Sequence, residues 1–200
     1  MNIVTNNRKY QVGISSQIMN AVYAYQQKEY WCWTASITNI LRAYGINNVS
    51  QEQFAQNICG VDLWGNACDC PATNYEVTKS LNFRGTDQNF RSFEIKAPLN
   101  EFSPNIDRLY KELSENKPVL VAYKTNTFIG HAVAVTGCEC EVRNGTTYVT
   151  KLFIRGPSPD TINKICNGKK EVKDVQAFLK RIYAHWYVAV YKNRAENYLF

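Results

Sequence analysis

The sequence predicts an α+β domain in which helices fill the first half of the chain and an antiparallel sheet fills the second. Apolar residues recur at three- and four-residue intervals before residue 115, which is the spacing of a helix face. Short apolar runs typical of strands dominate after residue 116. The 200 residues are 45% hydrophobic and 20% charged, which suits one domain with a substantial core. We therefore expect a single domain over 1–200, with a helical lobe at about 20–115 and a sheet lobe at about 116–200.

The strongest predicted helix covers residues 31–44, WCWTASITNILRAY. Its apolar side chains share one face, and these are Trp33, Ile37, Ile40, Leu41 and Tyr44. Gly45 follows as a C-terminal stop. Residues 1–30, before this helix, are mostly polar and are expected to be extended.

Shorter helices are predicted along the rest of the first half. Ser50 and Gln53 form a capping-box pattern, which predicts a helix that runs to about Ile58 and ends at Gly60. A second helix is expected at about 75–81. Ser103-Pro104 then predicts a third, because proline suits the first turn of a helix.

The predicted strands lie mainly in the second half of the chain. Asn144-Gly145 is a strong two-residue turn signal, so the segments on either side of it should form a hairpin. One further helix is expected over 172–182. The predicted strands are a short edge strand at 93–96, then 118–123, 131–136, 148–154 and 186–191.

Charge and hydropathy exclude several classes of protein. The net charge is +6, but its basic residues are scattered or grouped near 164–181 without a nucleic-acid-binding motif, so we expect no nucleic-acid partner. No stretch approaches the length of a membrane span. The first nine residues lack the pattern of a secretory signal peptide. We expect a cytoplasmic protein or one exported without a cleavable signal peptide, possible forms being a secreted effector or a chain whose leader was trimmed.

Cys32 is the candidate nucleophile, because it opens the strongest predicted helix. The positive end of the helix dipole and the free amides of the first turn stabilise a thiolate. The chain has seven cysteines, and an odd number leaves at least one unpaired.

His131 is the candidate base, because it opens a predicted strand directly after Gly130. A histidine there could face a helix terminus across a cleft and accept the thiol proton. The only other histidine, His185, is the competitor. Gln26, six residues before Cys32, could donate its amide to an oxyanion together with the Cys32 N–H, and its neighbour Gln27 is the alternative donor.

These segments resemble a known family. Residues 26–36, QQKEYWCWTAS, are similar to the active-site helix of bacterial papain-like cysteine peptidases, foremost the effector-type peptidases of plant pathogens and next the peptidases that trim double-glycine leaders. Residues 130–137, GHAVAVTG, resemble the histidine strand of the same families. The resemblance covers about residues 20–160. It implies a papain-like fold, with a helical N-terminal lobe that carries the cysteine and an antiparallel sheet lobe that carries the histidine.

The resemblance also implies a third residue, an Asp or Asn that orients the imidazole and often precedes a proline. The matching position here, before Pro157, is Gly156. Asp160 is the favoured substitute and Asn163 the alternative. A Cys/His dyad without a third residue, or an inactive copy of the enzyme, also fits this departure.

The other cysteines allow several states. Cys68-Asp69-Cys70 and Cys138-Glu139-Cys140 could supply four thiolates to zinc, although paired C-x-C is a less usual spacing than C-x-x-C. In related peptidases the loop after the second helix often carries cysteines, so Cys59, Cys68 and Cys70 could form a disulfide if the protein is exported. The remaining alternative is packing as small hydrophobes.

The sequence thus predicts a cysteine peptidase that acts on a protein or peptide substrate and needs no cofactor or metal. Cys32 is the nucleophile, His131 the base, Gln26 the oxyanion donor and Asp160 the orienting residue. Two alternatives remain: a thiol-dependent acyltransferase or deamidase on the same fold, and a catalytically inactive papain-like binding module.

Overall fold

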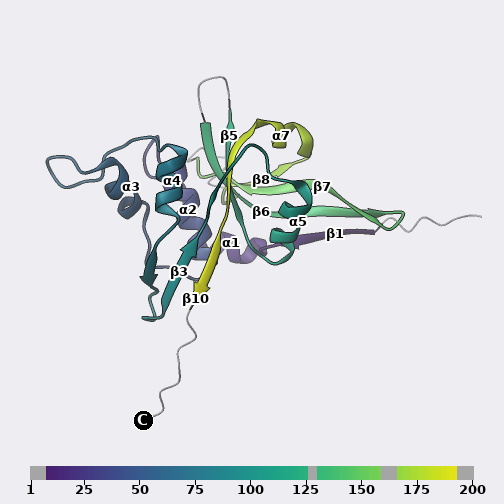
Figure 1. Ribbon diagram of the computed structural model, residues 1–200, viewed down its shortest axis with the longest axis horizontal. Helices are drawn as coiled ribbons and strands as arrows, with labels where there is room; N and C mark the ends of the chain where they lie inside the picture. Colours follow the sequence, from purple (N-terminus) through teal and green to yellow (C-terminus); the bar gives the residue numbers. More distant parts are fainter. Residues whose placement is uncertain (1–7, 126–129, 159–165, 193–200) are drawn as a thin grey trace, which may run out of the picture.

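The computed structural model describes residues 8–125, 130–158 and 166–192. It combines helices with a seven-stranded antiparallel sheet and a smaller three-stranded sheet (Figure 1). The helices are α1 (Ser16–Val22), α2 (Cys32–Ala43), α3 (Gln51–Cys59), α4 (Asn74–Ser80), α5 (Ile106–Ser114) and α7 (Val175–Arg181). The strands are β1 (Arg8–Gly13), β2 (Arg84–Thr86), β3 (Ser92–Lys96), β4 (Leu99–Glu101), β5 (Val119–Lys124), β6 (Gly130–Arg143), β7 (Thr146–Arg155), β8 (Lys169–Val172), β9 (Ile182–Tyr187) and β10 (Ala189–Lys192).

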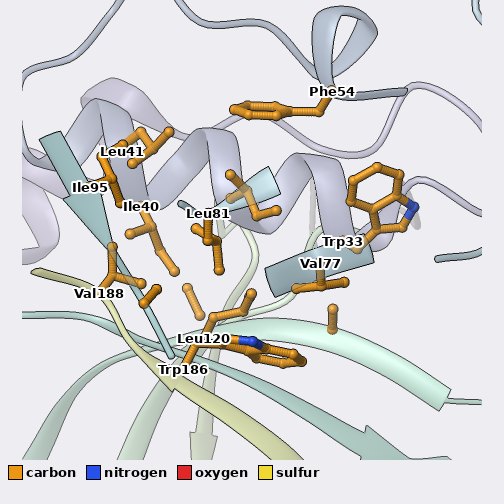
Figure 2. Packing of buried hydrophobic residues seen from close by; sticks show 14 of the residues in the cluster. Trp33, Ile40, Leu41, Phe54, Val77, Leu81, Ile95, Leu120, Trp186 and Val188 are labelled. Atoms are coloured by element: carbon orange, nitrogen blue, oxygen red, sulfur yellow. The ribbon is translucent and has the colours of Figure 1, made fainter. Parts of the chain in front are cut away.

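Helix α2 is the centre of the larger core. All its residues from Trp33 to Leu41 are buried. Figure 2 shows it between Phe54 of α3 on one side and Leu120 and Trp186 of the large sheet on the other. Burying apolar surface around the whole helix makes its position rigid, and this rigidity fixes where its first residue, Cys32, lies.

Strand β6 organises the large sheet. Its first part pairs with β5, its later part pairs with β1 on the same edge, and β7 pairs along the other edge. The small residues Ala132 and Ala134 belong to the core around α2. Val133 and Val135 alternate with them and belong to a second core, which α5 and α7 cover. Small side chains on the α2 side therefore let that helix approach the strand closely.

The structure confirms several predicted elements. The helix predicted at 31–44 is α2, and the one predicted at 75–81 is α4. The Ser50–Gln53 capping box is present with both of its hydrogen bonds, at 2.8 and 3.2 Å. Asn144 and Gly145 both have positive φ, as their two-residue hairpin turn requires.

Other elements were predicted wrongly. Residues 1–30 are not simply extended, because within the described part β1 joins the sheet and α1 follows. Strand β3 is not an edge, since β10 and β2 flank it. The predicted strand at 186–191 is two strands in different sheets, separated at Val188.

Two helix starts also differ from the prediction. Asn105, not the Ser103-Pro104 pair, caps α5, and its side chain accepts hydrogen bonds from the N–H groups of Asp107 and Arg108. In the segment predicted as one helix over 172–182, β8 ends at Val172 and α7 begins only at Val175. Asp174 caps α7 by accepting from the Ala177 N–H at 2.9 Å. In both helices, a polar N-cap residue sets the position where the helix begins.

Strand pairing crosses the predicted division near residue 116: β1 pairs with β6, β4 with β9, and β10 with β3. The division into a helical and a sheet lobe stays a prediction. Among the described residues, no helix is both long and apolar enough to cross a membrane.

Candidate active site

Cys32 is the first residue of α2 and is a free, half-buried cysteine. Burial raises the pKa of its thiol, because a thiolate loses its hydration there. Backbone N–H groups of Ala132, Trp33 and Cys32 itself point at the sulfur and act in the opposite direction. The site is therefore arranged to stabilise negative charge on this sulfur, although burial has the larger effect on its pKa.

One contact fixes α2 against the start of β6. The Ser36 hydroxyl, one turn after Cys32, donates a 3.0 Å hydrogen bond to the carbonyl of Ala132, and both groups are buried. The Ala132 N–H in turn points at the Cys32 sulfur. Since His131 directly precedes Ala132, the fold brings the backbone of the predicted base beside the predicted nucleophile.

His131 is the second residue of β6 and is half-buried. Tyr123 is its partner on β5, and the two rings meet edge to face with centroids 5.9 Å apart. Burial lowers the pKa of His131 to about 4, and the positive charge of Lys170 acts in the same direction. The imidazole is therefore neutral at physiological pH and can accept a proton.

Gln26 and Gln27 differ in exposure, which settles which of them points inward. Gln26 is 9% exposed and Gln27 is exposed. The Gln26 side-chain amide donates to the carbonyls of Lys28 at 3.0 Å and Glu29 at 2.6 Å. Gln26 thus closes the turn that leads into Cys32, and its amide would have to leave these carbonyls to reach an oxyanion.

The position where the family pattern expects a third residue lies beside this turn. The Gln26 N–H donates a 2.7 Å hydrogen bond to the Pro157 carbonyl, and the Tyr23 hydroxyl donates to the Gly156 carbonyl at 2.8 Å. Gly156 itself supplies only backbone groups. Asp160 and Asn163, the two predicted substitutes, lie outside the described residues.

Two tyrosines that the sequence interpretation did not identify lie near the thiol. The negative charge of a Cys32 thiolate would raise the pKa of both Tyr123 and Tyr183, after the larger effect of burial. The Tyr183 hydroxyl also lies over Gly130, so that a Cβ on Gly130 would come within 2.3 Å of it. Only the bulge between β5 and β9 places Tyr183 there, and a bulge has no clear signal in this sequence.

His185, the competing base, is a buried structural residue. It is 4% exposed, and its Nδ1 lies 3.0 Å from the Phe102 carbonyl. Its ring packs edge to face on Tyr187, with centroids 4.9 Å apart. Burial lowers its pKa as well. Its neighbours Ala184 and Trp186 belong to the core around α2, so alternation directs His185 to the opposite face of the sheet. Alternation does not separate the two histidines, because His131 likewise adjoins Ala132 of that core; the deeper burial of His185 and its contact with Phe102 do.

The loop after α3 supports the turn before Cys32. A disulfide joins Cys59 to Cys70, with Cα atoms 5.8 Å apart. The Asp69 carboxylate accepts hydrogen bonds from the N–H groups of Glu29 and Tyr30, at 3.2 and 3.0 Å. The Trp31 indole donates to the Cys68 carbonyl at 3.2 Å. The disulfide-closed loop thereby holds the residues that immediately precede the nucleophile.

The remaining cysteines do not form the zinc site considered as an alternative. Cys70 is bonded to Cys59, and Cys138 and Cys140 are fully buried in the core covered by α5 and α7. In the part of the chain that the structure describes, no three His, Cys, Asp or Glu side chains gather as metal ligands.

A mixed helix and antiparallel-sheet fold, with a cysteine at a helix start, is compatible with the class of cysteine hydrolases. The model of the Peptidase_C39-like family matches residues 18–151, which include Gln26, Cys32 and His131. The chain belongs to this family, and so to the cysteine peptidases of the C39 and papain-like type. No curated protein matches it. The effector-type subgroup stays a prediction.

Proposed function

We propose that this protein hydrolyses peptide bonds through Cys32 and His131. The observation that carries the proposal is the placement of the Cys32 thiol at the start of a rigid, buried helix, against the N–H of the residue after His131. Membership in the Peptidase_C39-like family supports it independently. The substrate is a protein or peptide.

The chemistry requires a proton transfer within the Cys/His pair. Burial favours the neutral thiol and the neutral imidazole, so the pair rests uncharged. The sulfur attacks the carbonyl carbon as its proton passes to His131. The resulting imidazolium protonates the leaving amine when the C–N bond breaks, which leaves a thioester on Cys32. Water, deprotonated by His131, then releases the carboxylate and restores the thiol.

The oxyanion formed on attack needs hydrogen-bond donors. The Cys32 N–H at the start of α2 is one, since the first N–H groups of a helix have no partner within it. Gln26 is proposed as the second, once its amide turns from the carbonyls of Lys28 and Glu29. Asp160 is proposed to orient His131.

The decisive test replaces Cys32 with Ala and measures cleavage of a peptide library. We expect kcat/KM to fall at least about 10³-fold, because the nucleophile is lost. Cys68→Ala is the matched control, since Cys68 is also a free, half-buried cysteine. Equal cleavage by the Cys32→Ala variant and the wild type would refute the proposal.

Product masses distinguish hydrolysis from the other thiol reactions. Hydrolysis gives two fragments whose masses sum to the substrate plus one water. A transferase would join the acyl fragment to an added amine, and a deamidase would leave the backbone intact. If no product forms and Cys32 is no more reactive toward an alkylating agent than Cys68, the protein is an inactive binding module.

The role of Asp160 has its own test. Asp160→Asn should lower kcat about tenfold or more while KM changes little, because an orienting carboxylate acts on the imidazole rather than on the substrate. Asn163→Ala is the comparison. An unchanged kcat in both variants would leave a Cys/His dyad as the catalytic unit.

A further inference from the structure

A small cavity lies where β1 leads into α1 and meets the ends of β7 and β8. Its volume is about 170 Å³. It lies outside the predicted catalytic residues. Its walls include the backbone around Gly13 and the side chains of Ser15, Thr136, Phe153, Arg155 and Lys169.

Arg155 is the unusual residue of this cavity, because its guanidinium is buried and no carboxylate among the described residues pairs with it. The residue is only 2% exposed. Its Nη1 donates to Asn20 Oδ1 at 2.8 Å, to the Asn167 carbonyl at 2.8 Å and to the Cys166 carbonyl at 3.4 Å. Its Nε is buried and has no hydrogen-bond partner. Within the described ranges, no carboxylate forms an ion pair with it. Burying a charge in this way is costly.

A second cation stands directly opposite the first. Lys169 of β8 is the register partner of Arg155 on β7, so their side chains leave the same face of the sheet. The Lys169 ammonium lies 5.2 Å from the centre of the Phe153 ring, and no described carboxylate forms an ion pair with it either. Like charges directly opposite each other on a sheet are destabilising. An anion between them would remove both penalties.

We propose that this cavity binds a small tetrahedral oxyanion of the phosphate or sulfate class. The hydrogen bonds of Arg155 to described residues use Nη1 alone, which leaves the Nε and Nη2 edge as a two-pronged donor of the geometry that oxyanions accept. Lys169 adds a second positive charge. The Ser15 hydroxyl accepts from the Ile18 N–H and still has its own hydrogen to donate. Ser15 and Ser16 are exposed, so an anion can enter from solvent on their side.

The test titrates the full chain with inorganic phosphate and, separately, with sulfate, at an ionic strength held constant with chloride. Calorimetry should show saturable binding of one anion per chain. At about ten times the dissociation constant, the melting temperature should rise by about 3–6 °C. Absence of saturable binding for both anions would overturn the proposal, because non-specific stabilisation by such salts does not saturate at one site.

Three variants locate the site. Arg155→Met and Lys169→Met should each weaken binding at least tenfold, and Lys169→Met keeps the protein testable if Arg155→Met does not fold. Lys180→Met removes the same charge from an exposed position of α7 and should bind as the wild type does. Equal weakening by all three variants would contradict a specific site. If the wild type does not bind but Asp160→Asn does, a carboxylate of the chain itself fills the cavity and the proposal is wrong.

Discussion

Two sets of cysteine and histidine residues lie on or against the large sheet, and their surroundings differ. Cys32 opens α2, and the backbone N–H of Ala132, the residue after His131 in β6, points at its sulfur. Cys138 and Cys140 lie farther along β6, with their sulfurs 3.6 Å apart, and His185 lies two strands away on β9. Burial raises the thiol pKa of Cys32 and of Cys138. Burial alone therefore does not distinguish the two sets.

The difference lies in what surrounds each sulfur. Backbone N–H groups point at Cys32 and lower its pKa against the effect of burial. The neighbour of Cys138 is the thiol of Cys140, which raises its pKa further. Cys32 is also half-buried rather than sealed. We therefore expect the thiol at the helix start to be the reactive one and the thiols in the interior of β6 to be inert.

Thiol labelling tests the expected difference in reactivity between Cys32 and the buried pair Cys138 and Cys140, and we expect its effect to be the largest. In native protein near pH 8.5, iodoacetamide should modify Cys32 at least about 10³ times faster than Cys138 or Cys140, because the buried pair becomes accessible only when the protein opens. Mass spectrometry of timed digests measures the rates. Comparable rates at Cys32 and Cys138 would show that the N–H groups at α2 do not create a reactive site.

The two histidines offer the second contrast. His131→Ala should lower kcat/KM by about 10²–10⁴-fold, as loss of a general base does, with little change in folding. His185→Gln should instead destabilise the fold by about 1–3 kcal/mol, because a buried residue loses its packing on Tyr187 and its contact with the Phe102 carbonyl. Peptidase assays and thermal melts of both variants measure the two effects. Loss of activity only in the His185 variant would reverse the assignment.

The sequence predicted the elements that carry the site better than the sheet that joins them. The apolar stripe of 31–44 and the Ser50–Gln53 capping box are local signals, and α2 and α3 follow them. Pairings such as β1 with β6 or β10 with β3 join residues more than 90 positions apart, and no local pattern encodes them. Cys32 and His131 could be selected because each sits at the start of a strongly patterned element.

Other parts of the site depend on tertiary structure. Gln26 and Gln27 are adjacent and chemically identical, so only the hydrogen bonds of the turn could show that Gln26 points inward. Tyr183 reaches the site through a bulge between β5 and β9. The buried Nε of Arg155, which has no hydrogen-bond partner, is a property of the folded surroundings and not of the segment FIRGP.

The pH dependence of the free energy of unfolding tests whether the His131 imidazole is buried and neutral in the folded protein. Its pKa is about 4 in the folded protein and about 6.5 when unfolded. Between pH 4 and pH 6.5, the His131 imidazole is protonated in the unfolded chain but stays neutral in the folded protein. The free energy of unfolding therefore falls as the pH drops from 6.5 to 4, by up to about 3 kcal/mol from this residue.

The variant His131→Gln should lack this contribution. Its free energy of unfolding, measured by urea denaturation at several pH values, should depend less on pH in that window than that of the wild type. His185 also has a lowered pKa, but it is present in both proteins and cancels in the difference. Parallel pH profiles would mean that His131 is solvated like an unfolded histidine, and the proposed neutral resting pair would be wrong.

The smallest expected effect concerns Tyr183, whose hydroxyl lies over Gly130 and whose pKa responds to charge on Cys32. Tyr183→Phe keeps the ring and removes the O–H, and we expect kcat/KM to fall about threefold to tenfold, the value of one hydrogen bond or dipole near the developing charge. Tyr123→Phe is the control, since its ring packs on His131 and on Phe178.

A double-mutant cycle tests whether the Tyr183 hydroxyl lies over Gly130. Gly130→Ala should destabilise the wild type more than the Tyr183→Phe variant, because the new methyl group would collide with the Tyr183 oxygen at 2.3 Å but meets the ring carbon only at 3.2 Å. Additive effects on unfolding would place Tyr183 away from Gly130 and remove it from the site.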